Sequence, residues 1–198
     1  AQSFAQGEIP IWTNYLGAGS PFLQFYGFTF YYAAALVHLL VRDLFWSIKI
    51  VLATCHVLSG VTMYLFLRVL CRSRHAGFLG GLAYVLSFWH TQQMPPMGRL
   101  PLSVFYACLP LPFYCFERLR ISRNWPGSAV WGAFYLGILA FTHPGYAFWA
   151  TVFLGVYATV RISSSRRRGI SRTWLRRTAL LLVAGVLFGS CLTVPMWL

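Results

Sequence analysis

The chain has 198 residues, of which 58% are hydrophobic and only 10% charged, and its 16 basic residues against three acids give a net charge of +13. Soluble domains average about 25% charged residues, so this composition argues against a water-soluble protein and predicts a helical membrane protein whose outer surface faces lipid. The basic residues cluster between apolar segments and are not interleaved with stacking aromatics, which argues against nucleic-acid binding.

The first 43 residues are expected to form an outer segment that ends in a helix lying in the outer leaflet. Tyr26–Val41 is apolar and rich in Phe and Tyr, which favour membrane interfaces, and it is followed by Arg42 and Asp43. The chain begins at Ala1 without a signal-peptide pattern and stops inside an apolar run, so we expect it to be a piece of a longer protein.

Residues 44–198 are predicted to be one membrane domain with about six spanning helices, so the expected fold class is an all-α polytopic bundle. A span needs about 20 apolar residues, and bilayer thinning can accommodate shorter ones. The six apolar segments are Leu44–Leu67, His75–Trp89, Leu102–Phe116, Ser128–Phe141, Tyr146–Val160 and Thr178–Trp197.

Prolines mark two irregular points in this bundle. Pro110 and Pro112 fall inside the third segment, where we expect a kink whose freed carbonyls are covered by neighbouring helices. Thr142–Gly145 has the composition of a turn that ends one helix and starts the next.

The positions of the basic residues support this order of crossings. Of the 16, 13 follow the first, third and fifth segments, and the others are Arg42, Lys49 and Arg99. Cytoplasmic loops are rich in Lys and Arg, so these three loops are predicted to be cytoplasmic. The outer segments are then residues 1–43, His90–Pro101 and the Thr142–Gly145 turn.

The cysteines and two of the histidines are predicted to be packing residues. Cys55, Cys71, Cys108, Cys115 and Cys191 form no CxxC pair, and four of them lie in apolar segments. We therefore expect no disulfide and no metal site. His38 and His56 also lie in apolar stretches and are expected to be core side chains.

Arg99 is the strongest candidate for a functional side chain. Apart from Arg42 near the interface, it is the only Arg in an outer loop, and a guanidinium can bind two phosphate oxygens at once. Contact with lipid headgroups is the alternative. His143 lies at an outer helix end, where it can donate to a phosphate or only stabilise its turn.

Other outer residues are candidates for contact with a sugar. His90, Gln92 and Gln93 can bind hydroxyl groups, although an interfacial polar loop is an equal alternative. Trp12 and Tyr26 flank a Gly- and Pro-containing loop and can stack on sugar faces.

Several short motifs resemble those of GT-C-like multi-pass membrane proteins of bacteria. Gly7–Tyr15, Gly17–Pro21 and Phe25–Tyr26 resemble the first outer loop of this group, which includes the 6-pyruvoyl-tetrahydropterin synthase-related membrane domain and the YfhO-like proteins. Met97–Leu100 and Leu109–Leu111 resemble the second outer loop and the next helix. The likeness covers roughly residues 7–115.

The resemblance implies a fragment of a GT-C-type glycosyltransferase of the bacterial cell envelope, embedded in the inner membrane. Such an enzyme moves a sugar from a polyprenyl-phosphate donor to an acceptor at the outer face. Arg99 and His143 would then bind the donor phosphate, and the loop containing Trp12, Asn14 and Tyr26 would shape the acceptor cleft.

The resemblance also implies a catalytic acid that this sequence does not supply clearly. The acid, commonly Asp, acts as a base or metal ligand and is expected upstream of Ala1. No cofactor is expected from the residues present, and a divalent metal in the full-length protein is left open. Glu8 is a weak candidate, and no acid follows Arg99 within Leu102–Tyr106. A non-catalytic scaffold or a transporter component is the alternative, although a proton-coupled transporter would need acids within its spans.

Overall fold

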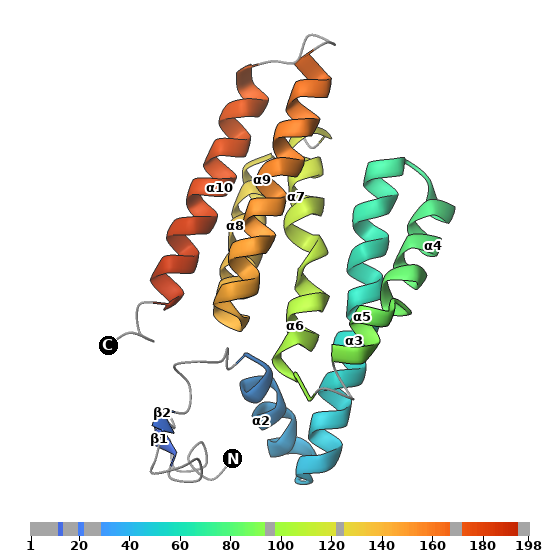
Figure 1. Cartoon of the computed structure of the whole chain (residues 1–198), viewed down its shortest axis with the longest axis vertical. Coiled ribbons are helices and arrows are strands. Elements are labelled where there is room, and N and C mark those ends of the chain that lie inside the picture. Colours follow the sequence, from blue (N-terminus) through green and yellow to red (C-terminus); the bar gives the residue numbers. More distant parts are fainter. Residues whose placement is uncertain are drawn as a thin grey trace.

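The computed structural model describes residues 12–13, 20–21, 29–93, 98–121, 125–166 and 172–193, and these are almost entirely helical (Figure 1). This confirms the all-α class for the described part. Its helices are α2 (Thr29–Val41), α3 (Leu44–Cys71), α4 (Arg74–Val85), α5 (Phe88–Gln93), α6 (Pro101–Cys108), α7 (Pro110–Ile121), α8 (Trp125–Thr142), α9 (Pro144–Arg166) and α10 (Arg172–Thr193). Two short strands, β1 (Trp12–Thr13) and β2 (Ser20–Pro21), pair in antiparallel fashion.

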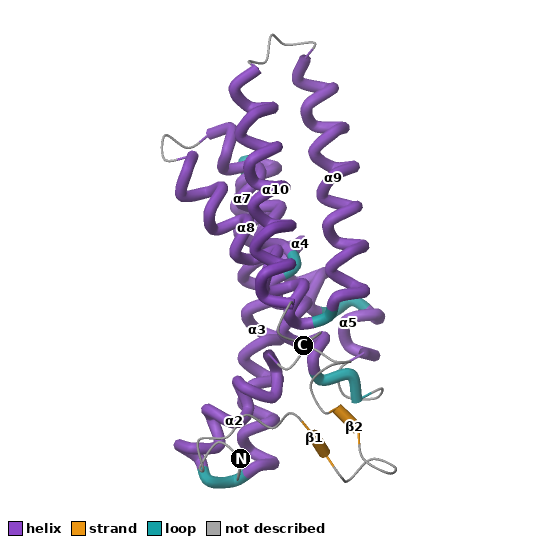
Figure 2. Tube along the Cα trace, turned by 90° about the vertical axis from the view of Figure 1, so that its left-hand side faces the viewer, coloured by secondary structure: helices purple, strands orange, loops and turns teal. Residues whose placement is uncertain are grey.

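The long helices run side by side in alternating directions and form an elongated bundle (Figures 1 and 2). Helix α8 packs against α7 and α10, and α3 packs against α4, α6 and α7. Their contacts enclose a core centred on Phe105, Phe116, Leu119, Leu154 and Leu181, which are all at most 4% exposed. Close packing of these large side chains holds the helices together through van der Waals contacts.

The two ends of the bundle differ in charge. The last turns of α3, α7 and α9 lie at one end, uppermost in Figure 1, together with the first turns of α4 and α10. This end carries Arg68, Arg72, Arg74, Arg118, Arg161, Arg176 and Arg177. The opposite end holds α2, α5 and the turn between α8 and α9.

Two of the described helices are long and apolar enough to cross a membrane, namely Leu44–Cys71 and Pro144–Ser164. They correspond to the first and fifth predicted spans. The second predicted span is interrupted, because α4 ends at Val85 and α5 begins at Phe88. With 12 residues, α4 is only about 18 Å long, whereas a bilayer core is about 30 Å thick.

Helix α2 (Thr29–Val41) is the described part of the expected Tyr26–Val41 helix, and residues 26–28 lie outside the described residues. Its buried residues, Phe30 and Ala34, form a small core with Val51 and Cys55 of α3. Its far side is apolar and open, with Leu40 85% exposed. The segment is therefore an apolar helix attached to one end of the bundle by the face that carries Phe30.

The predicted interruption of the third segment lies at Leu109, between α6 and α7. Pro110 has no backbone N–H, so the carbonyl of Tyr106 loses its usual helical donor. The hydroxyl of Tyr84, on α4, donates to that carbonyl at 3.1 Å. The expectation that a neighbouring helix covers a carbonyl freed by this proline is confirmed.

Replacement of Tyr84 by Phe is expected to lower the free energy of unfolding by about 1–3 kcal/mol, because it removes the hydroxyl that donates to a buried carbonyl. In a Pro110→Ala background the same change should cost less, since the introduced alanine supplies its own N–H for the Tyr106 carbonyl. Thermal unfolding of the four proteins in detergent measures this coupling. An equal loss in both backgrounds would show that the hydroxyl stabilises the protein through some other contact.

Candidate functional site

A cavity of 470 Å³ lies at the end of the bundle opposite the Arg-rich end. It is lined by residues of α2, of the first turn of α6 with the segment before it, and of the α8–α9 turn: Tyr31, Gly98, Arg99, Pro101, Leu102, His143 and Tyr146. The structure therefore brings together Arg99 and His143, the two residues that the sequence suggested for phosphate binding. They come from different connections between helices.

Arg99 is held at the mouth of this cavity by the turn before α6. Gly98 adopts a φ of +64°, a left-handed conformation that glycine takes without steric cost. The exposed guanidinium of Arg99 donates from Nη1 to the hydroxyl oxygen of Tyr146 at 3.2 Å. A guanidinium has five N–H donors, so this bond positions the group and leaves it able to bind a ligand anion.

His143 links the cavity to the start of α9. Its Nδ1 accepts a hydrogen bond from the backbone N–H of Tyr146 at 3.4 Å, and its ring contacts the Tyr146 ring with centroids 4.5 Å apart. Pro144 follows as the first helical residue, a position that suits its fixed φ. In the neutral ring the proton is then on Nε2, which makes that atom a donor.

The environment keeps His143 neutral near pH 7. Burial lowers the pKa of His143 below its ordinary value of 6.5, and the nearby positive charge of Arg99 lowers it further, against a backbone hydrogen bond that raises it. A negatively charged ligand in the cavity would oppose both effects, because it stabilises the imidazolium. An anion bound in the cavity would therefore favour protonation of His143.

The cavity is electropositive because Arg99 lies among helix ends and no acid of the described residues lines it. Both α6 and α9 begin here, and helix N-termini favour negative charge. The described part of the chain contains two acids, and neither lines the cavity. Asp43 caps α3 by accepting the N–H of Trp46 at 2.9 Å, and Glu117 is buried against Arg161. The arrangement suits an anion, and the described residues supply no carboxylate for catalysis at this cavity.

His90 lies elsewhere, inside the bundle, with 1% of its surface exposed. Its ring stacks on Tyr106 at 4.7 Å and meets the edge of His56 at 5.2 Å, while Nε2 is 3.4 Å from Ser59 Oγ. Residues 88–93 fold as the short helix α5, which carries His90 into this position. The structure thus places His90 in a buried position on a short helix and not in an open loop, and its predicted contact with a sugar stays a prediction.

Of the remaining candidates for sugar contact and catalysis, Gln92 does not line the cavity, and the side chains of the others lie outside the described residues. Gln92 is half-buried on α5, and Trp12 lies in β1. Glu8, Asn14 and Tyr26 lie outside the described residues, as does the side chain of Gln93. Their predicted roles stay predictions.

Two tyrosines at the cavity were not identified from the sequence. Tyr146 occupies the first turn of α9. The preceding His-Pro-Gly sequence predicts the start of a helix there, but it does not indicate that Tyr146 faces a cavity. Tyr31 reaches the cavity from α2, which is anchored by a hydrogen bond from Thr29 Oγ1 to Thr142 Oγ1 at 3.0 Å. Thr142 in turn donates to the carbonyl of Ile138 at 2.7 Å, so α2 is joined to the last turn of α8.

No protein-family description, curated protein or solved structure matches this chain. Within the described residues, no group of three or more His, Cys, Asp or Glu side chains is arranged to hold a metal ion. The chemistry of the cavity is thus what supports a function.

Proposed function

We propose that this chain is part of a bacterial inner-membrane protein with about six spanning helices, and that the Arg99 cavity binds the phosphate of a polyprenyl-phosphate sugar at the outer face. The observation that carries this proposal is the meeting of Arg99, His143 and Tyr146 in one electropositive cavity. The class of protein proposed is a GT-C-like glycosyltransferase.

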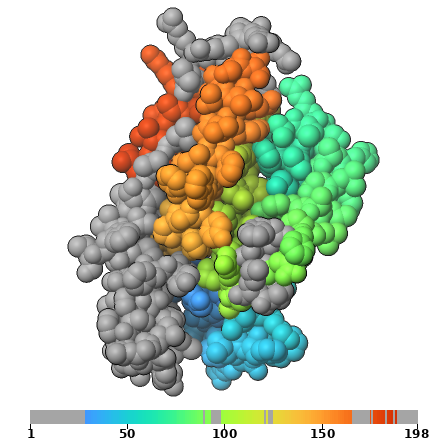
Figure 3. Space-filling model, in the orientation of Figure 1, coloured from blue at the N-terminus to red at the C-terminus, as the bar shows by residue number. Residues whose placement is uncertain are grey.

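The surface of the described helices supports a membrane location. Large apolar side chains are exposed on α3, α4, α8, α9 and α10, including Val57, Leu58, Phe78, Leu79, Val130, Trp131, Phe148, Phe153, Leu180 and Leu187. Helices α4 and α9 make up much of the face seen in Figure 3. Exposure of so many large apolar side chains is unfavourable in water, whereas lipid solvates them.

The distribution of charge supports an orientation. The Arg-rich end would face the cytoplasm by the positive-inside rule. The Arg99 cavity would then face outwards, with α2 beside it in the outer leaflet. Lys49 lies near the outward end of α3, where its ammonium is 4.1 Å from the Phe45 ring centroid.

The chemistry of transfer fits the residues of the cavity. When the sugar leaves its donor, the lipid phosphate gains negative charge, which the fixed guanidinium of Arg99 stabilises. Nε2–H of His143 is a second donor for a phosphate oxygen. The base that activates the acceptor must come from outside the described residues, either Glu8 or a segment upstream.

A phosphate-binding scaffold without transferase activity is the second candidate, favoured by the lack of a carboxylate at the cavity among the described residues. Vesicles that contain the protein, a labelled polyprenyl-phosphate sugar and cell-envelope acceptors separate the two. Labelled product supports the transferase. Binding of polyprenyl phosphate without product supports the scaffold, and equal binding of polyprenol, which lacks the phosphate, contradicts both.

Replacement of His143 by Asn is expected to remove a pH dependence of donor binding. In the native protein, affinity should rise by roughly tenfold as the pH falls from about 7.5 to 5.5, because the bound phosphate raises the lowered pKa of His143 and a proton is taken up. Asn still caps α9, so the fold is retained. Titrations with a polyprenyl phosphodiester, which keeps one charge over this range, measure the effect. The same pH slope in both proteins would exclude His143 as the titrating group.

A further inference from the structure

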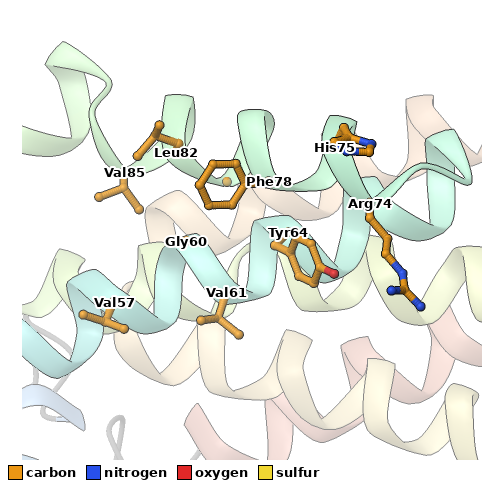
Figure 4. A pocket seen from close by; sticks show the side chains of 10 residues that line it. Val57, Gly60, Val61, Tyr64, Arg74, His75, Phe78, Leu82 and Val85 are labelled. Carbon is orange, nitrogen blue, oxygen red and sulfur yellow. The ribbon is translucent and has the colours of Figure 1, made fainter.

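A second candidate site lies on the outward side of the α3–α4 pair, at the Arg-rich end. The two helices cross closely at glycines, since a Cβ on Gly81 would lie 2.7 Å from the carbonyl oxygen of Gly60. A groove of 640 Å³ runs along this crossing. Figure 4 shows its apolar length from Val57 and Val85 to Phe78, with Arg74 and His75 at one end.

We propose that this groove binds one anionic glycerophospholipid of the cytoplasmic leaflet, with an acyl chain along the apolar length and the phosphate at Arg74. This site lies at the opposite end of the bundle from the Arg99 cavity. It requires that the bundle lies in a bilayer, but it does not depend on what the Arg99 cavity binds.

Charge selects the headgroup. Arg74 is exposed and is the first residue of α4, so the positive end of the helix dipole adds to its own charge. Ser73 caps the helix by accepting the N–H of Ala76 at 3.3 Å, which leaves earlier N–H groups of the first turn for a phosphate. Neither acid of the described residues lines the groove. A zwitterionic lipid would bind this end of the groove less favourably, because the cationic group of its headgroup is repelled by Arg74.

The dimensions of the groove fit one leaflet. A helix rises by about 1.5 Å per residue, so the distance from Arg74 to Val85 is about 16 Å. Half of a hydrocarbon core of about 30 Å is about 15 Å. The apolar wall therefore extends from the headgroup level to the middle of the bilayer, and Val61, Phe78 and Leu82 would contact the chain of the lipid.

Native mass spectrometry of the full chain, released from micelles that contain either phosphatidylglycerol or phosphatidylcholine, tests this site. Replacement of Arg74 by Gln is expected to reduce retained phosphatidylglycerol about fivefold, the effect of one cation near an anionic lipid. Replacement of Val61 by Trp fills the groove and should reduce retention of both lipids. The matched controls are Arg72→Gln, in the same exposed turn, and Leu79→Trp, on an exposed position of α4 outside the groove.

The outcomes separate a specific site from general attraction. The proposal is supported if Arg74→Gln and Val61→Trp retain less phosphatidylglycerol than the native protein while both control variants retain as much. Equal loss in Arg72→Gln and Arg74→Gln would show that the whole basic end attracts lipid, and an unchanged Val61→Trp would exclude the groove. A dimer of the native chain that Val61→Trp converts to monomer would assign the groove to a second copy and overturn the lipid assignment.

Discussion

Arg99→Ala is expected to abolish sugar transfer by the parent protein and to weaken binding of polyprenyl phosphate by roughly 10- to 100-fold, while the protein stays folded. Hydrogen bonds to a charged group contribute about 1.5–3 kcal/mol, which corresponds to this range. The only side-chain hydrogen bond seen from Arg99 within the described residues is to Tyr146, at an exposed position. Its loss should therefore leave the thermal midpoint nearly unchanged.

Three further variants make the Arg99 experiment specific. Arg99→Lys keeps the charge but loses the planar fork, so its affinity should fall between those of the native protein and Arg99→Ala. Tyr146→Phe removes only the bond that orients the guanidinium and should have a smaller effect. Lys49→Ala removes an exposed cation from α3 that does not line the cavity, and it should bind normally. Unchanged turnover in Arg99→Ala would exclude the phosphate role.

Glu117→Ala is expected to destabilise the bundle by about 3 kcal/mol, the lower end of the range for breaking a buried ion pair. Glu117 is fully buried on α7, and both its oxygens bind Arg161 of α9, at 2.8 and 2.9 Å. Tyr157 donates to the same carboxylate at 2.7 Å. The expected cost is at the low end of this range because the Arg161 side chain is 30% exposed, so water can solvate its charge once Glu117 is removed.

Thermal unfolding measures the contribution of Glu117, and its midpoint should fall by about 6–12 °C for a chain of this size. Arg118→Gln changes the exposed neighbour and should have little effect. Glu117→Leu combined with Arg161→Leu should recover most of the loss, because it leaves no unpaired charge. If the double variant is as unstable as Glu117→Ala, the stabilisation comes from packing and not from the ion pair.

The sequence predicted the boundaries between helices where a nearby residue, such as a proline, marks them. Pro110 marked the interruption between α6 and α7 because proline removes a donor, and the Thr142–Gly145 turn was marked by its composition. The break between α4 and α5 had no such signal. It falls at Leu86 and Ser87, where neither Gly nor Pro occurs and the apolar run continues, so tertiary packing decides it.

The candidate site was predictable in part. Arg99 and His143 were placed on the same face because charge alternation assigned both connections to it, and the structure brings them into one cavity. Tyr31 could not be found, because its place depends on how α2 folds back on the bundle. His90 was expected in an outer loop because polar residues follow it, but polarity along three or four residues does not show which side of a short helix turns inwards.

The hydrogen bond between Thr29 and Thr142 has an entropic consequence. It fixes the start of α2, and hence the wall formed by Tyr31, before any ligand arrives. A wall that is already ordered costs little conformational entropy on binding, so more of the interaction free energy with a phosphate is kept as affinity. Loss of the hydrogen bond between Thr29 and Thr142 would therefore weaken ligand binding, although neither threonine lines the cavity.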